Sequence, residues 1–471
     1  MKSWLLALPC LWLAGVGPVS ADARTNVVLI LADDLGYGDL SGYGHSKFRT
    51  PQLDRMAAEG AKLMHFNCPM AYCAPTRASL LTGRYPFRCG LNENPAPDGG
   101  GADRNELHLP ESEVLLPQLL NKSGYATCMI GKWHLGHAKL EWLPTHRGFD
   151  EYYGIPYSND MRPVQVLEGD KRVEYPVVQA TLTQRYTARA LDFIERNRAR
   201  PFFLYFPQML VHKPLSASEA FYKKSGAGLY GDAMAELDWS VGRVLAKLKE
   251  LNLDSQTLVI FTSDNGATFG GSTGGLRGMK SSTYEGGYRV PCIARWPGKI
   301  PAGHVSLEPA VMMDLCATVL KVTGVAAPAD RVMDGLDIMP LFTSAAKSPH
   351  DFILGQRGDK IATVRDARWK LHLLAPNIGL AASYKPGDHK TDPRAPDGVT
   401  ILAPYEQAQG SELPGVTTGD APKPMQLFDL LSDPAEQHDV ARDHPEVVQR
   451  LAEAGEKMRR EAAAAQARPK N

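Results

Sequence analysis

The chain has 471 residues, and its 52 lysines and arginines balance its 52 aspartates and glutamates, so the formal net charge is zero. This balance excludes the single-sign field of a typical nucleic-acid-binding or membrane-surface protein, and we expect no nucleic-acid partner. Hydrophobic residues make up 44% and charged residues 22% of the chain. That composition is ordinary for a globular protein, and the length suffices for one large domain with a smaller attachment.

The first 23 residues have the features of a secretory signal peptide. A basic residue precedes an apolar run over residues 4–19, and Ala21-Asp22-Ala23 matches the small-residue cleavage site of such segments. The run is too short for a membrane span, and no later stretch is long and apolar enough. We therefore expect an exported chain, periplasmic or secreted, with the signal removed near Ala23. The single glycosylation sequon, at Asn121, favours a bacterial origin.

Two strongly apolar segments predict buried strands that end in oxygen-bearing side chains. Residues 26–31 are followed by Asp33 and Asp34, and residues 257–262 are followed by Asp264 and Asn265. Continuous apolar runs are typical of parallel strands buried on both faces. Open α/β sheets bind ligands beyond the carboxyl ends of their strands, and such oxygens are ligands of Ca²⁺ and Mg²⁺. The first pair alone is better explained by a solvated loop, whereas the two strand ends together predict a divalent-cation site.

The remaining elements indicate an α/β fold in two parts. Periodicity and capping predict helices over residues 51–58, 76–81, 113–122, 183–197, 230–251, 314–322 and 446–465, and strands over residues 62–66, 124–130 and 201–206. Beyond residue 351 the segments are short, at residues 361–364, 369–374 and 427–430, around an irregular loop over residues 376–424. We predict a large, mostly parallel sheet sandwiched by helices in residues 24–345. A smaller antiparallel sheet with a terminal helix is expected in residues 346–471.

Nucleophilic and basic side chains lie at the ends of these predicted elements. Cys73 stands just ahead of a helix that starts near Pro75, where free backbone N–H groups favour an anion. Lys132 and His134 follow a buried strand and have the same parity in an extended segment, so both are expected to face one side. His212 follows another strand, but a packed core histidine explains that position equally well.

Other polar residues lack such context. His137 and His146 are expected to be structural or solvated, and Glu285 and Arg289 are expected to be structural. Beside Cys73, the predicted mature chain has an odd number of cysteines: Cys68, Cys89, Cys128, Cys292 and Cys316. An odd number argues against a complete disulfide framework, so we expect buried free thiols with at most one or two bridges.

Several stretches resemble signatures of the sulfatase family, over about residues 26–341 with weaker support to residue 429. Cys73-Ala74-Pro75-Thr76-Arg77 resembles the pentapeptide whose cysteine a maturation enzyme oxidises to Cα-formylglycine. Residues 124–134 resemble the second signature, Gly-Tyr-x-Thr-x-x-x-Gly-Lys-x-His. Residues 280–291 resemble a Lys-x-x-x-Tyr-Glu-Gly-Gly-x-Arg-x-Pro segment whose lysine, here Lys280, contacts sulfate. Residues 154–160 are a looser match to the segment that carries Ser158, and a plain turn explains them nearly as well.

The resemblance implies an alkaline phosphatase-like fold, a sulfuric ester hydrolase and a complete site. One hydroxyl of the hydrated formylglycine at residue 73 would attack sulfur, and the other would later expel sulfate. The implied metal ligands are Asp33, Asp34, Asp264, Asn265 and residue 73, and calcium, with its six to eight oxygen ligands, is preferred over magnesium. Arg77 and Lys132 would hold the diol, with Ser158 as a hydrogen-bond partner. His134 would take a proton, and His212 and Lys280 would bind sulfate and assist the leaving alcohol.

The sequence leaves two alternatives and the natural substrate open. One alternative is a phosphodiesterase or phosphonate monoester hydrolase of the same superfamily, and the other is a non-catalytic exported protein that binds sulfated glycans. Residues on the expected leaving-group side are Tyr157, Asn159, Asp160, Arg162 and Lys213. This segment resembles arylsulfatase A-like and galactosamine-6-sulfatase-like members, which implies aryl sulfates in vitro and a sulfated sugar or glycolipid as the natural substrate.

Overall fold

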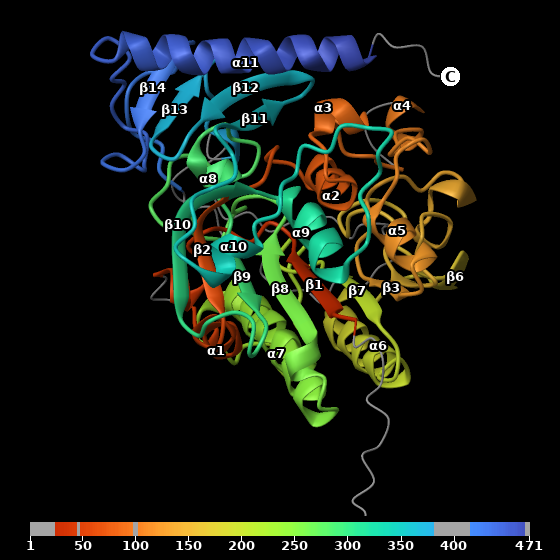
Figure 1. The fold of residues 1–471 in the computed structure, drawn as a ribbon. Helices are drawn as coiled ribbons and strands as arrows, with labels where there is room; N and C mark the ends of the chain where they lie inside the picture. The colour runs from red at the N-terminus through yellow and green to blue at the C-terminus, as the bar shows by residue number, and fades with distance from the viewer. Residues whose placement is uncertain (1–23, 45–47, 98–101, 381–414, 467–471) are drawn as a thin grey trace, which may run out of the picture.

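The computed structural model describes residues 24–44, 48–97, 102–380 and 415–466 (Figure 1). The predicted signal peptide lies outside the described residues, as does most of the predicted irregular loop. No helix in the described ranges combines the length and the apolar character needed to cross a bilayer.

A ten-stranded mixed sheet forms the centre of the larger part, in the order β10-β2-β9-β8-β1-β7-β3-β4-β5-β6. Its strands are β1 (Asn26–Ala32), β2 (Ala61–Asn67), β3 (Ala126–Ile130), β4 (Glu151–Gly154), β5 (Val166–Glu168), β6 (Lys171–Glu174), β7 (Phe202–Pro207), β8 (Thr257–Ser263), β9 (Cys292–Arg295) and β10 (His304–Val311). The central run from β8 to β4 is parallel, whereas β9 is antiparallel to both its neighbours and β5 and β6 are antiparallel additions. The structure therefore confirms the predicted α/β class with a mostly parallel sheet.

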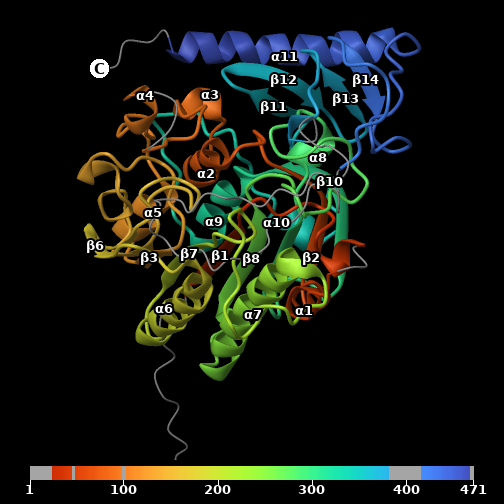
Figure 2. The ribbon, with the colours of Figure 1, turned by 180° about the vertical axis from the view of Figure 1, so that it is seen from behind.

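Helices cover both faces of this sheet because β1 and its parallel neighbours are apolar on both sides. On one face, Val28 and Ile30 of β1 pack with residues of α1 (Pro51–Ala58), α6 (Leu182–Arg196) and α7 (Gly228–Glu250), which are seen in front of the sheet in Figure 2. On the other face, Val27 and Leu29 pack with α2 (Cys73–Thr82), α5 (Leu116–Lys122), α9 (Asp314–Thr323) and α10 (Met339–Thr343). Shorter helices are α3 (Pro86–Cys89), α4 (Ala102–Asn105), α8 (Glu285–Tyr288) and the 3-10 turns η1 (Ser41–Tyr43), η2 (Leu140–Trp142), η3 (Pro144–His146), η4 (Gln179–Thr181) and η5 (Asp254–Gln256).

The C-terminal part is a four-stranded antiparallel sheet with one long helix across it (Figure 1). Its elements are β11 (Ile353–Arg357), β12 (Lys360–Arg365), β13 (Trp369–His372), β14 (Gln426–Asp429) and α11 (Pro445–Gln466). Leu451 of α11 packs with Val364 and Leu371 in an apolar core that also contains Phe87 of α3 and Val311 of β10 from the larger part. We call residues 346–380 and 415–466 the C-terminal subdomain.

Two predicted helix bounds were wrong. α2 begins at Cys73 with Tyr72 as its N-cap, so Cys73 is in the helix and not ahead of it. Proline needs no N–H partner in the first turn, and Pro75 at the third position therefore allows the earlier start. α5 begins at Leu116 and not at Glu113, with Pro117 in its first turn.

The six cysteines within the described residues are all free and buried, in agreement with the free-thiol prediction. Since none of these six forms a disulfide, the described part of the fold is held together without a covalent cross-link.

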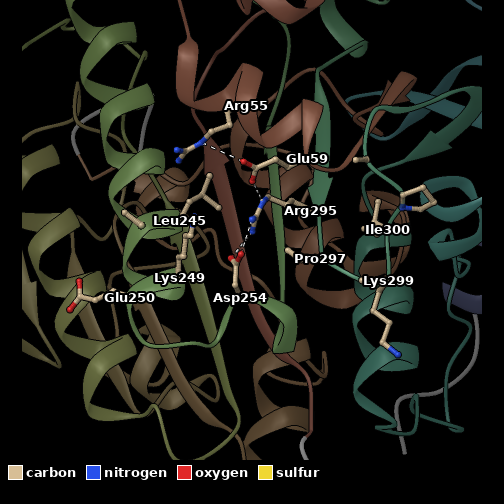
Figure 3. A pocket seen from close by; sticks show the side chains of 14 residues that line it. Arg55, Glu59, Leu245, Lys249, Glu250, Asp254, Arg295, Pro297, Lys299 and Ile300 are labelled. Atoms are coloured by element: carbon tan, nitrogen blue, oxygen red, sulfur yellow. Dashed lines mark hydrogen bonds and ion pairs between the residues drawn. The ribbon is translucent and has the colours of Figure 1, made fainter.

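A cavity of about 950 Å³ lies at the amino-terminal end of β8 (Figure 3). Arg295 crosses it and donates to Asp254 at 2.6 Å and to Glu59 at 2.6 Å, so its charge is already balanced. Asp254 lies three residues before β8 and Asp264 immediately follows it, and the seven residues of the strand span about 23 Å. This cavity is therefore remote from the predicted site, and Arg295 connects α1 to η5 there.

Candidate active site

The parallel pairing of β1 with β8 brings the two predicted groups of ligands together. Ala32 lies opposite Ser263, so both strands end at the same level and their polar residues follow at one edge. The N–H of Asp34 donates to Oδ1 of Asp264 at 3.1 Å. Asp34 itself has a φ of 61°, in the left-handed region that few non-glycine residues adopt. This conformation turns the chain sharply after β1 and keeps both aspartates buried at the sheet edge.

Cys73 meets this edge from the first turn of α2. Its Sγ lies 3.4 Å from Oδ1 of Asp33 and 3.4 Å from Nζ of Lys280, and its side chain is buried. Burial, followed by the charge of Asp264, raises the pKa of the thiol well above its usual value. An unmodified Cys73 is therefore neutral here and a poor nucleophile, since the thiolate is the reactive form.

Arg77 lies one turn further along α2 and is fully buried. Its Nε and Nη2 donate to Oδ2 of Asp264 at 3.0 and 2.7 Å, and its Nη1 donates to the carbonyl of Lys132 at 3.0 Å. Burial lowers the pKa of Arg77, but the charges of Asp264 and Asp33 outweigh it and raise the pKa overall. The guanidinium thus joins three distant segments of the chain at one point.

Two lysines complete the cluster, and Lys132 is buried whereas Lys280 is partly exposed. Nζ of Lys132 donates to Asp33 at 2.6 Å and to Oγ of Ser158 at 3.1 Å. Nζ of Lys280 lies 2.7 Å from Oδ1 of Asp34. Burial raises the pKa of both aspartates, but the nearby cations outweigh it and hold each pKa below its usual value. Both carboxylates are therefore ionised.

The two predicted site histidines occupy different environments. Nε2 of His212 lies 3.5 Å from Oδ2 of Asp34, and its Nδ1 is 2.6 Å from the carbonyl of Lys213. Nε2 of His134 lies 3.1 Å from the carbonyl of Pro95, and no described residue hydrogen-bonds its Nδ1. Burial lowers the pKa of His134 well below its usual value, and the charges of Lys132 and Arg77 lower it further, so its ring is neutral.

The prediction that Lys132 and His134 lie on an extended segment was wrong. β3 ends at Ile130, and Gly131 and His134 have φ values of 124° and 64°, so the segment is a loop and not an extended strand. The two side chains nevertheless lie close enough for the charge of Lys132 to act on His134. Of the residues predicted to be structural or solvated, His146 lies at the surface beside Asp170, and the ring of His137 packs edge-on against Tyr157. Glu285 and Arg289 form a buried ion pair, as a structural role predicts.

The oxygen ligands fit a hard divalent cation. Asp33, Asp34, Asp264 and Asn265 are all buried, and Oδ1 of Asn265 is a buried oxygen with no hydrogen-bond donor among the described residues. Asp33, Asp34, Cys73 and His212 each place a ligand atom within 4.8 Å of the others. Carboxylate and amide oxygens select calcium or magnesium over metals that prefer sulfur.

Asp39 supports this site, although its position in the sequence did not single it out. Its Oδ2 accepts from the N–H of Gly36 at 2.6 Å and from Tyr230 at 2.7 Å, and its Oδ1 accepts from the N–H of Ser272 at 2.6 Å. These bonds tie the loop after β1 to the loop between Asn265 and Lys280. A Cβ on Gly36 would lie 2.2 Å from the carbonyl of Ser272, so the approach of the two loops requires glycine there.

Comparison with known proteins assigns the family. The sulfatase family model matches residues 25–325. N-acetylgalactosamine-6-sulfatase of Canis lupus familiaris is 42% identical over 395 residues, which cover 78% of this chain and 75% of that protein. Arylsulfatase A of Homo sapiens is 36% identical over 469 residues, which cover 90% and 86%. The structure of the PsFucS1 sulfatase from Pseudoalteromonas sp. superposes with a TM-score of 0.75 at 27% identity, over 94% of this chain and 91% of that one.

The chain belongs to the sulfatase family, and it is an enzyme that hydrolyses sulfate esters. Sulfatases typically use a metal ion and a formylglycine, and the buried cluster of Asp33, Asp34, Cys73 and His212 is where this chain could hold the metal. The assignment removes the alternative of a non-catalytic glycan-binding protein.

Asp39 should make stability depend on pH. Burial raises the pKa of Asp39 to about 7, whereas an aspartate in an unfolded chain titrates near 3.9. Between these values the folded protein binds more protons, so the stabilisation from Asp39 is present at low pH and lost as the pH rises toward 7. We expect the difference in unfolding free energy between the parent and Asp39→Asn to shrink over this range, by at most about 1.4 kcal/mol per pH unit. Urea unfolding at several pH values measures the difference, and a constant value would contradict the prediction.

Proposed function

We propose that the protein removes sulfate from a sulfated sugar or glycan through a nucleophile at residue 73. One observation carries the proposal: Sγ of Cys73 lies 3.4 Å from Oδ1 of Asp33 and 3.4 Å from Nζ of Lys280, in a cluster of three buried carboxylates and three cations. A sulfate ester needs its negative oxygens neutralised and a nucleophile in line with the leaving oxygen. Preorganised charges at the reacting centre are usually the largest single contribution to catalysis.

Burial keeps the Cys73 thiol protonated and therefore a poor nucleophile, and conversion to formylglycine would replace it by a group that needs no thiolate. The hydrated aldehyde supplies a hydroxyl nucleophile and, afterwards, a second hydroxyl that allows sulfate to leave. Lys132 and Arg77 lie beside residue 73 and would orient its oxygens, and Ser158 hydrogen-bonds Lys132 at 3.1 Å. The maturation enzyme of the family would therefore be a necessary partner.

Asp33, Asp34, Asp264 and Asn265 would hold a calcium ion, with magnesium less suitable because it demands a smaller, more rigid octahedron. When bound, the ion supplies positive charge to the sulfate oxygens. The exposed fraction of each of the four ligands is 1% or less, so water would compete little with the substrate for this charge.

The remaining basic groups divide between residue 73 and the sulfate. The neutral ring of His134 can accept a proton, as the removal of a hydroxyl proton at residue 73 requires. Lys280 and His212 both lie against Asp34, one at 2.7 Å and the other at 3.5 Å, and would bind the sulfate and assist departure of the alcohol.

The substrate class is proposed from relatives and from the leaving-group side of the site. The compared relatives are named for N-acetylgalactosamine 6-sulfate and for aryl sulfates. Burial raises the pKa of Asp160, but His212, Lys132 and Lys280 outweigh it and lower the pKa to about 2. An ionised carboxylate at this position suits the hydroxyl or amide N–H groups of a sugar. Tyr157, Asn159, Arg162 and Lys213 are the other proposed contacts.

Replacement of Cys73 by alanine should abolish sulfate release and leave the fold intact, because the side chain contributes the nucleophile and little core volume. Circular dichroism and release of sulfate from p-nitrophenyl sulfate measure the two effects. Intact and peptide mass spectrometry of the parent should show residue 73 about 18 Da lighter than cysteine when the host has the maturation enzyme. Substantial activity in Cys73→Ala would exclude this nucleophile.

Intact mass spectrometry of the parent also tests the proposed export, since residues 1–23 should be missing from exported protein.

Chelation should inactivate the enzyme reversibly. Calcium should restore sulfate release and raise the melting temperature of the chelated protein, because an ion that binds only the folded state stabilises it. Asn265→Ala should shift both titrations to higher calcium concentrations, and magnesium should be less effective at equal concentration. Full activity after complete removal of divalent metal, checked by elemental analysis, would reject the metal site.

Sulfate release from a panel of sulfated mono- and oligosaccharides, including N-acetylgalactosamine 6-sulfate, tests the substrate class. We expect a sulfated sugar to have a higher kcat/KM than p-nitrophenyl sulfate, because remote contacts to the sugar are available to stabilise the transition state. A phosphodiester, bis(p-nitrophenyl) phosphate, is the comparison substrate. Faster turnover of the phosphodiester than of every sulfate ester would favour the phosphodiesterase alternative.

A further inference from the structure

The segment that carries Lys280, residues 277–289, has little regular structure of its own. Its only helix is the four-residue α8, and Gly278 and Ser281, on either side of Lys280, have φ values of 77° and 66°. Ser281 is not glycine, so the left-handed conformation directly after Lys280 must be stabilised by surrounding contacts. The position of Nζ of Lys280 therefore depends on what holds this segment.

The C-terminal subdomain supplies many of those contacts. The N–H of Gly278 donates to the carbonyl of Val416 at 2.9 Å, and Nδ2 of Asn377 donates to the carbonyl of Ser281 at 2.8 Å. Arg277 donates from Nη1 to the carbonyl of Glu436 at 2.9 Å. Figures 1 and 2 both show α8 next to the small sheet of the C-terminal subdomain.

Glu436 makes the most extensive of these connections. Its Oε2 accepts from the N–H of Glu285 at 2.6 Å, and its Oε1 lies 2.7 Å from Nε2 of His372 and 3.1 Å from Nζ of Lys370. Its side chain is fully buried, and its φ is 53°, again in the left-handed region. One carboxylate thus joins the start of α8 to two residues of β13.

A second buried carboxylate extends the connection. Glu285 contacts Lys370 at 3.0 Å, Arg365 at 3.0 Å and Arg289 at 2.7 Å, and its exposed fraction is zero. Burial raises the pKa of Glu285, but Lys370, Arg289 and Arg365 outweigh it and hold the pKa well below its usual value. Removing one member of such a cluster leaves a buried charge without its partner, so the segment would shift to find another.

From these contacts we infer that Glu436 is a positioning residue for Lys280, acting through α8 and Arg277. The inference rests on the proposed role of Lys280 at the sulfate. It assigns the C-terminal subdomain a part in the reaction, although none of the proposed catalytic side chains belongs to it. A displacement of about 1 Å at a catalytic group can lower a rate about 100-fold, so a modest shift of residues 277–289 is sufficient.

A double-mutant cycle tests the connection between Glu436 and Lys280. Glu436→Gln keeps the side-chain volume but replaces one carboxylate oxygen by an amide N–H₂ group. That group would face either the N–H of Glu285 or the side chains of His372 and Lys370, which donate to Glu436 in the parent, so a donor would then face a donor. We expect this variant to lower kcat/KM for p-nitrophenyl sulfate about tenfold or more in the parent. In the Lys280→Ala background the same change should lower kcat/KM less than about twofold, because the group it positions is already absent. All rates are normalised to the formylglycine content measured by mass spectrometry.

Asp314→Asn is the matched control. Asp314 is also a fully buried carboxylate that accepts from backbone N–H groups, of Val311 and Leu336, and contacts a histidine, His350. None of these partners belongs to residues 277–289. Asp314→Asn should lower the melting temperature about as much as Glu436→Gln does. Its effect on kcat/KM should be small and should be the same in the parent and in the Lys280→Ala background.

Two outcomes would overturn the inference, and they can be told apart. Factors for Glu436→Gln and Lys280→Ala that multiply independently would overturn the positioning role while leaving the role of Lys280 in place. An unimpaired Lys280→Ala would overturn the proposed role of Lys280 and this inference with it. If Glu436→Gln does not fold, His372→Asn removes one partner of Glu436 and leaves Lys370 in place, and it should show the same dependence on Lys280.

Discussion

Three buried carboxylates, Asp33, Asp34 and Asp264, have to lie within a few ångströms of one another, and the rest of the site is arranged around that constraint. Like charges in a dry interior repel strongly, so each needs an opposite charge at short range. Arg77 contacts Asp264, Lys132 contacts Asp33, and Lys280 contacts Asp34. These cations come from three segments far apart in the chain. These cations stabilise the buried carboxylates, and they also surround Cys73 with the positive groups that a sulfate ester requires.

Backbone geometry at the site follows from this crowding. Asp34 and His134 both adopt left-handed φ values, which cost free energy in non-glycine residues. Asp39 binds the loops on either side of the cluster to each other, and Gly36 allows them to touch. These conformations lower the free energy of unfolding, but they hold the side chains in place for a charged substrate. Preorganisation of this kind is where most enzymes of this sort obtain their rate.

Buried ion pairs join the two parts of the molecule, in addition to the apolar core that they share. Residues 277–289 connect the large sheet to the small one, with Lys280 at one end of the contact and Glu285 and Glu436 at the other. A buried network of this kind adds little to stability compared with apolar packing, but it tolerates few alternative arrangements. The large cavity beside Arg295 lies at the opposite end of the strands, where the ion pairs connect a helix to a turn and reach no catalytic group.

Much of the fold and of the site could be predicted because the necessary information is local in the sequence. Apolar runs over β1 and β8 predicted buried parallel strands, and the residues directly after them predicted oxygen ligands. The motifs around Cys73, Lys132 and Lys280 indicated the family. Local patterns failed where a contact from elsewhere decided the conformation. Pro75 suggested a later start for α2 than Cys73, and the parity of Lys132 and His134 assumed an extended strand that ends at Ile130.

The sequence by itself determined the class of fold, the family and the residue types available for chemistry, because hydrophobic periodicity and short motifs depend only on neighbours along the chain. Only the tertiary structure decided which carboxylate meets which cation, that Cys73 is too buried to act as a thiolate, and that Asp39 and Glu436 hold distant loops. Those facts depend on the register of β1 against β8 and on the docking of the small sheet. Pairings between residues more than 150 positions apart are set by packing and buried charge, for which no local pattern exists.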